Sequence, residues 1–128
     1  MAVLLDTNVV IHLRDGDVAV TSRIQSLQEP LLLSVVTRVE LEGGVYRDPA
    51  QAGQRRPRLD SILATIPVLA FDDASADAYR RIVEIAGYSR RKLLDRMIAA
   101  QALVHHATLA TLNAADLADI PGLQLLAW

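Results

Sequence analysis

The sequence predicts an α/β fold, a three-layer α/β/α sandwich around a central, mainly parallel five-stranded sheet. Short apolar runs alternate along the chain with segments of helical periodicity, which is the order of elements in α/β proteins. The run Leu31–Val36 (LLLSVV) also lacks the polar–apolar alternation of a half-exposed strand. It therefore has the pattern of a strand buried on both faces, as strands of parallel sheets are. A length of 128 residues predicts a single domain over residues 1–128.

Five short apolar runs are the predicted strands. The first opens the chain, and the second follows Pro30. Runs of this length are typical of strands and too short for most helices. The predicted strands are residues 2–5, 31–36, 67–71, 107–111 and 123–127.

The segments between these runs carry the predicted helices. Residues 72–87 have apolar side chains at helical spacing from Tyr79 onward, and Gly87 ends the helix. Residues 93–106 are apolar on nearly every side, which indicates a buried helix. The polar stretch 47–58 contains two prolines and one glycine and is predicted to be a surface loop. The other predicted helices are residues 8–14, 18–28, 37 to the mid-40s and 59–65, with a helical turn at 113–118.

The composition excludes several classes of protein. Hydrophobic residues make up 52% of the chain, and no apolar run approaches the roughly 18 to 20 residues of a membrane span. The chain has no cysteine, so disulfides and cysteine-ligated zinc are excluded. The first apolar run is too short for a signal peptide. We therefore expect a cytoplasmic protein without membrane contact.

The basic residues are mostly arginines, and several stand in clusters. The net charge of −2 argues against binding of nucleic acid by bulk charge alone. Of the 13 basic residues, 12 are Arg, which suits bidentate contacts with phosphate. One cluster comprises Arg90, Arg91 and Lys92. The alternative interpretation is that such clusters are solvated helix faces.

Acidic residues follow three of the predicted strands. Asp6 comes directly after the first strand, Glu40 four residues after the second, and Asp116 five residues after the fourth. The carboxyl ends of parallel strands lie at one edge of a sheet, where open α/β sheets bind ligands. We therefore expect these acids to meet in one crevice. Asp95, near the start of the buried helix before the fourth strand, can reach the same edge.

Helix formation offers another interpretation for three of these acids. Thr37 and Glu40 have the spacing of a capping box. Asn113 and Asp116 have the same spacing, with Asn113 as the cap. Asp95 lies in the first turn of a helix, where a negative charge suits the helix dipole.

Asp6 is less well explained by capping, because Asn8 is itself a good residue to start the next helix. Its alternative role is that of a sheet-edge acid that accepts hydrogen bonds from nearby N–H groups. Asp72 and Asp73 also follow a predicted strand, but we assign them to the start of the next helix. They are therefore not part of the predicted site.

Four carboxylates in one crevice would repel one another unless cations compensated their charge. Mg²⁺ and Mn²⁺ prefer oxygen ligands and leave room for water and phosphate oxygens. His12, His105 and His106 are not spaced to form a zinc site with these acids. The acids therefore predict a site for Mg²⁺ or Mn²⁺.

Four motifs along the chain resemble, in order, the motifs of one known family. They are LLDTNVVI with Asp6, SVVTRVELEGGV with Glu40 and Gly44, LLDRMIAAQAL with Asp95, and TLATLNAADLADIPGLQL with Thr111, Asn113 and Asp116. The whole chain thus resembles the PIN-domain nucleases, in particular the small VapC-type toxins of bacterial toxin–antitoxin pairs. Leu117 stands where the family usually has Phe, which changes packing and leaves the chemistry intact. The segment before Asp95 is more basic than usual.

The resemblance implies a toxin that acts as a metal-dependent endoribonuclease on structured RNA, such as tRNA or rRNA. It implies one or two Mg²⁺ or Mn²⁺ ions, a homodimer, and a cognate VapB-like antitoxin that forms a heterotetramer or larger assembly with the toxin. Antitoxins of the family cover the acidic pocket, and antitoxin and toxin together commonly bind their promoter. Operator DNA would therefore be contacted only through the antitoxin.

The resemblance and the acid pattern together suggest roles for three groups of residues. The proposed catalytic and metal-binding acids are Asp6, Glu40, Asp95 and Asp116. The polar residues expected to position water, phosphate or the acids are Thr7, Asn8, Thr111 and Asn113, with Asn113 expected to hold Asp6. The basic residues expected to contact the RNA backbone are Arg90, Arg91, Lys92 and Arg96.

Three alternatives stand beside this interpretation. Receiver-like and phosphatase-like α/β proteins also place an Asp after the first strand, but they need a lysine near the end of a later strand. The only lysine, Lys92, lies at a predicted helix start. A non-catalytic PIN-like binding module would not need an intact set of acids. A DNA flap-type nuclease shares the chemistry, but this chain lacks the length for elements that thread DNA.

Overall fold

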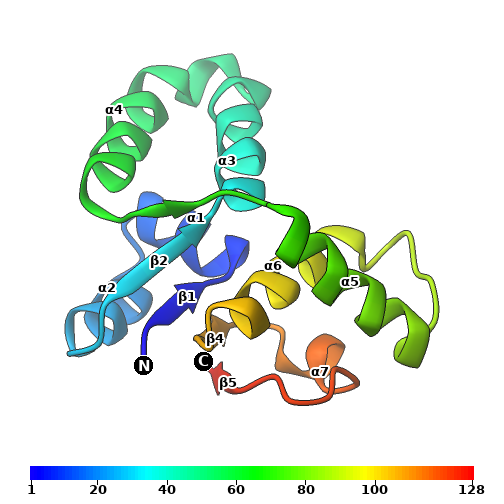
Figure 1. Ribbon diagram of the computed structural model, residues 1–128. Coiled ribbons are helices and arrows are strands. Elements are labelled where there is room, and N and C mark those ends of the chain that lie inside the picture. Colours follow the sequence, from blue (N-terminus) through cyan, green and yellow to red (C-terminus); the bar gives the residue numbers. More distant parts are fainter.

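Five parallel strands form one sheet in the order β3-β2-β1-β4-β5, in a computed structural model that describes residues 1–128 (Figure 1). Leu4 at the centre of the sheet lies opposite Leu32 on one side and Leu109 on the other. The predicted five-stranded sheet is therefore confirmed, and it is parallel throughout. The strands are β1 (Val3–Leu5), β2 (Leu31–Ser34), β3 (Val68–Leu69), β4 (Thr108–Thr111) and β5 (Leu125–Ala127).

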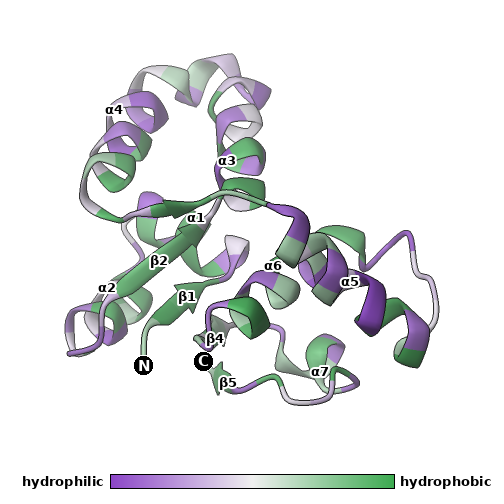
Figure 2. Ribbon diagram, viewed as in Figure 1, coloured by the Kyte–Doolittle hydropathy of each residue, from purple (hydrophilic) through white to green (hydrophobic).

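Helices cover both faces of this sheet, because successive strand residues point to opposite faces. Val3 and Leu5 belong to the core cluster that packs on α1 to α4, and Leu4 belongs to the cluster that packs on α5 to α7. Figure 2 shows β1 and β2 as hydrophobic strands, as burial on both faces requires. The predicted three-layer sandwich is confirmed. The helices are α1 (Thr7–Arg14), α2 (Val18–Gln25), α3 (Val35–Arg47), α4 (Pro49–Thr65), α5 (Asp73–Ala86), α6 (Leu93–Val104) and α7 (Ala114–Leu117).

The predicted surface loop over residues 47–58 is wrong, because α3 and α4 form a helical hairpin there (Figure 1). Asp48 joins the two helices, and its carboxylate accepts a hydrogen bond from the amide of Ala50 at 3.1 Å. Pro49 lies in the first turn, where a missing N–H costs nothing. Pro57 does lie inside α4, but the helix continues because its next turns bury apolar side chains, including Leu59, against the core.

Helix α3 begins two residues earlier than predicted, and this changes the interpretation of Glu40. The Ser34 hydroxyl accepts a hydrogen bond from the amide of Val36 at 3.0 Å, so Ser34 is the helix cap. The capping box of Thr37 and Glu40 is therefore absent. Both side chains lie within the helix, three residues apart on one face, and are free to serve the site.

Helices α5 and α6 agree with their sequence patterns. The Asp72 carboxylate accepts a hydrogen bond from the amide of Ser75 at 2.9 Å, and Gly87 ends α5 with a φ of 83° that favours glycine. Asp72 thus caps a helix, as predicted. Helix α6 packs against α5 and buries most of its length. No helix in the protein is long and apolar enough to traverse a bilayer.

Candidate functional site

Asp6 lies at the carboxyl end of β1 and is 4% exposed. One carboxylate oxygen accepts a hydrogen bond from the Thr7 amide and the other from the Thr111 hydroxyl, each at 2.8 Å. Asp6 is therefore the cap of α1, and the prediction that Asn8 starts this helix is wrong. Asn8 is exposed, and its backbone carbonyl contacts His12 Nδ1 at 2.7 Å. Capping and placement at the sheet edge are combined in a single residue, Asp6.

Glu40 is held beside Asp6 by a chain of two threonine hydroxyls. Thr7 Oγ1 donates to Glu40 Oε1 at 2.8 Å and lies 2.9 Å from Thr37 Oγ1. Since a hydroxyl has one proton to donate, Thr37 must donate to Thr7. Thr37 is fully buried and Thr7 nearly so. This chain orients one oxygen of Glu40 and leaves Oε2 without a protein partner.

Asp116 is held by a different residue pair. Asn113 Nδ2 donates to Asp116 Oδ2 at 2.8 Å, and Arg91 lies 3.3 Å from the same oxygen. The hydrogen bond from Asn113, and next the one from Arg91, lowers the pKa of the Asp116 carboxyl. The expectation that Asn113 holds Asp6 is therefore wrong, because Thr111 makes that contact.

Asp95 lies within electrostatic reach of the other three acids. It lies in the first turn of α6, and no protein donor lies within hydrogen-bonding distance of its carboxylate. Burial raises its pKa to about 6, and repulsion from Asp6, Glu40 and Asp116 contributes in that order. Burial is also the main cause of the raised pKa of Asp6 and Glu40. Four acids from four separate elements therefore lie within electrostatic reach of one another, as the strand pattern predicts.

The donor set suits a hydrated divalent cation. No three acidic or histidine side chains lie close enough together to hold one ion between them. Mg²⁺ commonly takes only one or two carboxylates directly and fills its other positions with water. An all-oxygen set of four acids, in which burial and then repulsion from the other three raise the pKa of Asp95, fits Mg²⁺ or Mn²⁺. His105 and His106 lie beyond the far end of α6 from Asp95 and contribute nothing to this set.

The four basic residues predicted to contact RNA have different positions. Arg90 and Arg91 are exposed, whereas Lys92 lies 3.7 Å from the Asp119 carboxylate. Lys92 therefore does not occupy the strand-end position that a receiver-like protein requires. Arg96 is only 2% exposed, so its assignment to the RNA backbone is wrong.

Arg96 instead joins the loop after α5 to the segment after α7. It donates to the Gly87 carbonyl at 2.6 Å and lies 3.3 Å from Asp119. Arg96 Nε is buried without a partner. The carbonyl that Arg96 satisfies is that of the residue ending α5, so the guanidinium links three elements around the base of α6.

We expect Arg96→Leu to lower the free energy of unfolding by about 2 to 4 kcal/mol, because a buried charged group and its partners lose their pairing. Urea denaturation of the purified variant measures this change. Arg90→Ala, six residues earlier and exposed, is the matched control and should alter stability by less than about 0.5 kcal/mol. An Arg96→Leu variant of unchanged stability would contradict the structural role.

The polar residues around the acids were only partly predictable. The spacing of Thr37 and Glu40 predicts a capping box, but the same spacing of three residues also places the two side chains on one helix face. Ser34 and Gln101 were not predicted at all. Both are fully buried and lie where α3 and α6 meet the sheet.

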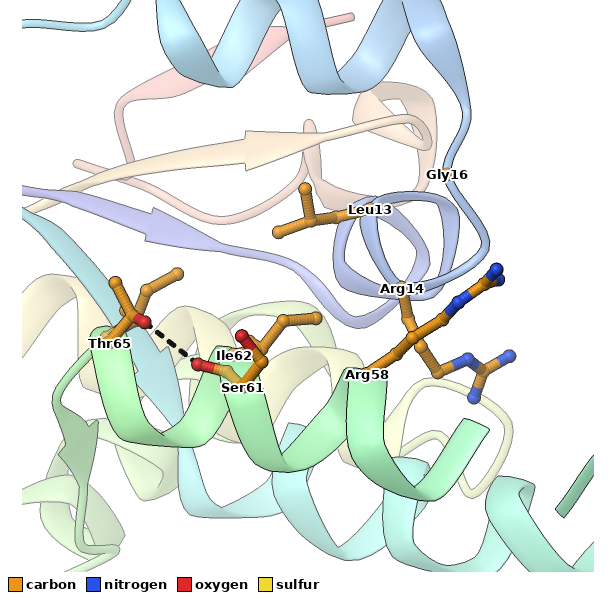
Figure 3. Close-up of a pocket in the computed structure, with 8 residues that line it drawn as sticks. Leu13, Arg14, Gly16, Arg58, Ser61, Ile62 and Thr65 are labelled. Atoms are coloured by element: carbon orange, nitrogen blue, oxygen red, sulfur yellow. Dashed lines mark hydrogen bonds between the residues drawn. The ribbon is translucent and has the colours of Figure 1, made fainter. Parts of the chain in front are cut away.

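A separate cavity of about 450 Å³ lies between the end of α1 and α4, at the opposite end of α1 from Asp6 (Figure 3). In the view of Figure 3, Arg14 and Arg58 lie toward one end of the cavity and Thr65 toward the other. None of the four acids lines it. The residues that line it are Leu13, Arg14, Gly16, Arg58, Ser61, Ile62, Thr65 and Ile66.

Fold and site together define an α/β protein with an acidic centre at the carboxyl edge of a parallel sheet. The sequence profile of the PIN domain matches residues 3–123, and the chain belongs to the PIN-domain family. Members of this family are generally nucleases. The family predicted from the four motifs is therefore confirmed. Comparison with curated protein sequences finds no match.

Solved structures of similar fold cover almost the whole chain. FitAcB from Neisseria gonorrhoeae has a chain with 28% identity and a TM-score of 0.82, over 97% of this chain and 96% of that one. VapBC2 from Rickettsia felis, bound to a promoter DNA fragment, has one with 24% identity and a TM-score of 0.85, over 100% and 99%. VapBC-5 from Mycobacterium tuberculosis, a member of a family of toxin–antitoxin systems, has one with 26% identity and a TM-score of 0.70, over 98% and 96%. The chain therefore has the same fold as these toxin–antitoxin proteins, as its resemblance to VapC-type toxins implies.

Proposed function

We propose that the chain, acting as one domain over residues 1–128, is the toxin of a toxin–antitoxin pair and a metal-dependent endoribonuclease. Its substrate would be a structured RNA, such as tRNA or rRNA. The observation that carries this proposal is the placement of the acids at one edge of the sheet, where the Thr7 amide donates to Asp6 and the Thr7 hydroxyl donates to Glu40. Burial, and then repulsion from the three other acids, raises the pKa of Asp95 beside them. Such a concentration of negative charge suits a site whose charge is balanced by Mg²⁺ or Mn²⁺.

One or two ions would be held at the four acids, each by one or two carboxylates directly and by water at its other positions. A bound ion would supply a nucleophile at neutral pH and neutralise charge on the phosphate. The protein's own contribution is orientation. Thr7 fixes Glu40 through Oε1, and Thr111 fixes Asp6 through Oδ2. Glu40 Oε2 and both oxygens of Asp95 have no protein partner and would be available to an ion or its waters.

The RNA backbone would approach across the loop before α6. Arg90 and Arg91 are exposed there, and Arg91 lies beside Asp116 at the edge of the acidic centre. A guanidinium at that position can contact a phosphate whose neighbour lies over the acids. Lys92, already close to Asp119, would contribute charge to the same surface.

The partners proposed are a second copy of the chain and a VapB-like antitoxin, assembled as a heterotetramer or larger. The support comes from the similar structures, most of which are named as VapBC or FitAB assemblies, and three of them are bound to DNA. Contact with operator DNA would be made by the antitoxin, because the net charge of −2 on the toxin chain argues against binding of duplex DNA by bulk charge.

Removal of metal tests the catalytic proposal. We expect the purified chain to cleave a pool of total RNA in the presence of Mn²⁺ or Mg²⁺, and to lose this activity when EDTA is added, because the acids alone cannot stabilise the phosphate. Product lengths on a denaturing gel are the measurement, and re-addition of Mn²⁺ is the control. Cleavage that persists in EDTA would contradict the proposal. Binding of Mn²⁺ without cleavage of any RNA would favour the non-catalytic alternative.

A further inference from the structure

Gln101 is a fully buried polar residue, and both its amide oxygen and its amide nitrogen form hydrogen bonds within the protein. Its Oε1 accepts from the Ser34 hydroxyl, and its Nε2 donates to the carbonyls of Leu69 and Ala70 at 3.2 and 3.1 Å. A helix residue in α6 is thereby joined to the carboxyl ends of two neighbouring strands, β2 and β3. Buried amides satisfied in this way specify one arrangement, because any other would leave polar groups unpaired.

Ser34 extends this connection into α3. Its hydroxyl donates to Gln101 and also accepts from the amide of Val36 at 3.0 Å, which caps α3. The two acid-bearing helices are thus joined by hydrogen bonds at one crossing point. Apolar contacts around this point are not directional. Hydrogen bonds have preferred distances and angles, so they fix the position and the rotation of one helix relative to the other.

The hydrogen bond between Ser34 and Gln101 is the same number of residues away from both acids. Six residues separate Ser34 from Glu40 along α3, and six separate Gln101 from Asp95 along α6, which is about 9 Å in each helix at the helical rise per residue. The Glu40 carboxylate is close enough to contribute to the raised pKa of Asp95, so the two acids lie on the same side of this hydrogen bond. A rotation of about 10° at the crossing would therefore move Asp95 by roughly 1.5 Å relative to Glu40, since the lever is about 9 Å.

We propose that Gln101 is a positioning residue for the acidic centre. It sets the separation of Glu40 and Asp95 by locking α6 to the cap of α3. This role rests on the proposed function, because the separation matters only if the two acids share an ion. Functional groups need placement to within about 0.5 Å, and a shift of Asp95 by roughly 1.5 Å exceeds that tolerance.

Mn²⁺ affinity of the purified chain tests this role without requiring RNA cleavage. The variants are Gln101→Met, which keeps the volume and removes the three hydrogen bonds, and Ser34→Ala, which removes one. The matched control is Ser75→Ala, which removes the hydrogen bond of 2.8 Å from the buried Ser75 hydroxyl to Asp72, the cap of α5. Electron paramagnetic resonance measures free Mn²⁺, circular dichroism measures Tm, and RNA cleavage is recorded in parallel.

We expect Gln101→Met to lower Mn²⁺ affinity about tenfold, Ser34→Ala to lower it less, and the double variant to match Gln101→Met, since both changes break one connection. Ser75→Ala should lower Tm and leave Mn²⁺ affinity unchanged. Affinity within twofold of wild type in both variants, with Tm lowered as in Ser75→Ala, overturns the positioning role alone. A wild type that neither binds Mn²⁺ nor cleaves RNA overturns the proposed function and the positioning role with it.

Discussion

Replacement of Asp6 by Asn is expected to lower the rate of RNA cleavage about a thousandfold and to leave the fold intact. A metal ion that stabilises a transition state by several kcal/mol corresponds to about three powers of ten in rate, and Asp6 is the most buried of the four acids. Asn keeps an oxygen that can accept from the Thr7 amide, so the cap of α1 remains. Single-turnover cleavage of a labelled RNA is the measurement.

The matched control for this variant is Asp72→Asn. Asp72 also follows a strand and also caps a helix through its carboxylate, but it lies outside the acidic centre. Its replacement should therefore leave cleavage within about twofold of wild type. Full activity of Asp6→Asn would remove Asp6 from the proposed metal site. Equal loss in both variants would show that helix capping, and not charge at the sheet edge, is responsible.

Replacement of Asp95 by Asn is expected to stabilise the metal-free protein while abolishing cleavage. The pKa of Asp95 in the folded chain, about 6, lies above the ordinary value of 3.8. The folded chain therefore binds more protons than the unfolded chain between about pH 4 and pH 6. The free energy of unfolding falls as pH rises through this window and is then constant. Asn removes this loss, because it carries no charge.

The expected gain at pH 7 is about 1 to 2 kcal/mol, less than the roughly 3 kcal/mol of the full pKa displacement, because a half-buried group is partly screened by water. Urea denaturation in EDTA at pH 4, 5, 6 and 7 measures it. The difference between Asp95→Asn and wild type should grow from pH 4 to pH 6. With Mn²⁺ present, wild type should recover stability and the variant should recover less. A variant less stable than wild type at pH 7 in EDTA would contradict the electrostatic account.

Much of the acidic centre could be predicted because strand ends are visible in the sequence. Asp6 directly follows an apolar run, and strand direction alone brings the ends of β1, β2 and β4 to one edge. The partners of the acids were less accessible. Asn113 and Thr111 both lie near the end of β4, and only the geometry separates the residue that holds Asp116 from the residue that holds Asp6.

The errors share one physical origin, which is that tertiary contacts decided against a local preference. The presence of Pro57 in a polar stretch predicted a loop, but burial of the apolar face of α4 against the core stabilises a helix there. The position of Arg96 next to a basic segment predicted a surface contact with RNA. Instead, the side chain is buried, because the Gly87 carbonyl and Asp119 pair with it. The spacing of Thr37 and Glu40 predicted a helix cap at Thr37, but α3 begins earlier and Ser34 is its cap.

The sequence by itself determined the order of strands and helices, the parallel sheet and the four acids at its edge. These features depend on hydrophobic period and on residues adjacent to strand ends, which are local properties. Only the tertiary structure decided that Asp6 both caps α1 and lies beside the other acids, that Arg96 is internal, and that Gln101 joins α6 to the cap of α3. Each of these depends on hydrogen bonds between residues far apart in the chain, such as Thr111 to Asp6 across 105 positions, which no local pattern encodes.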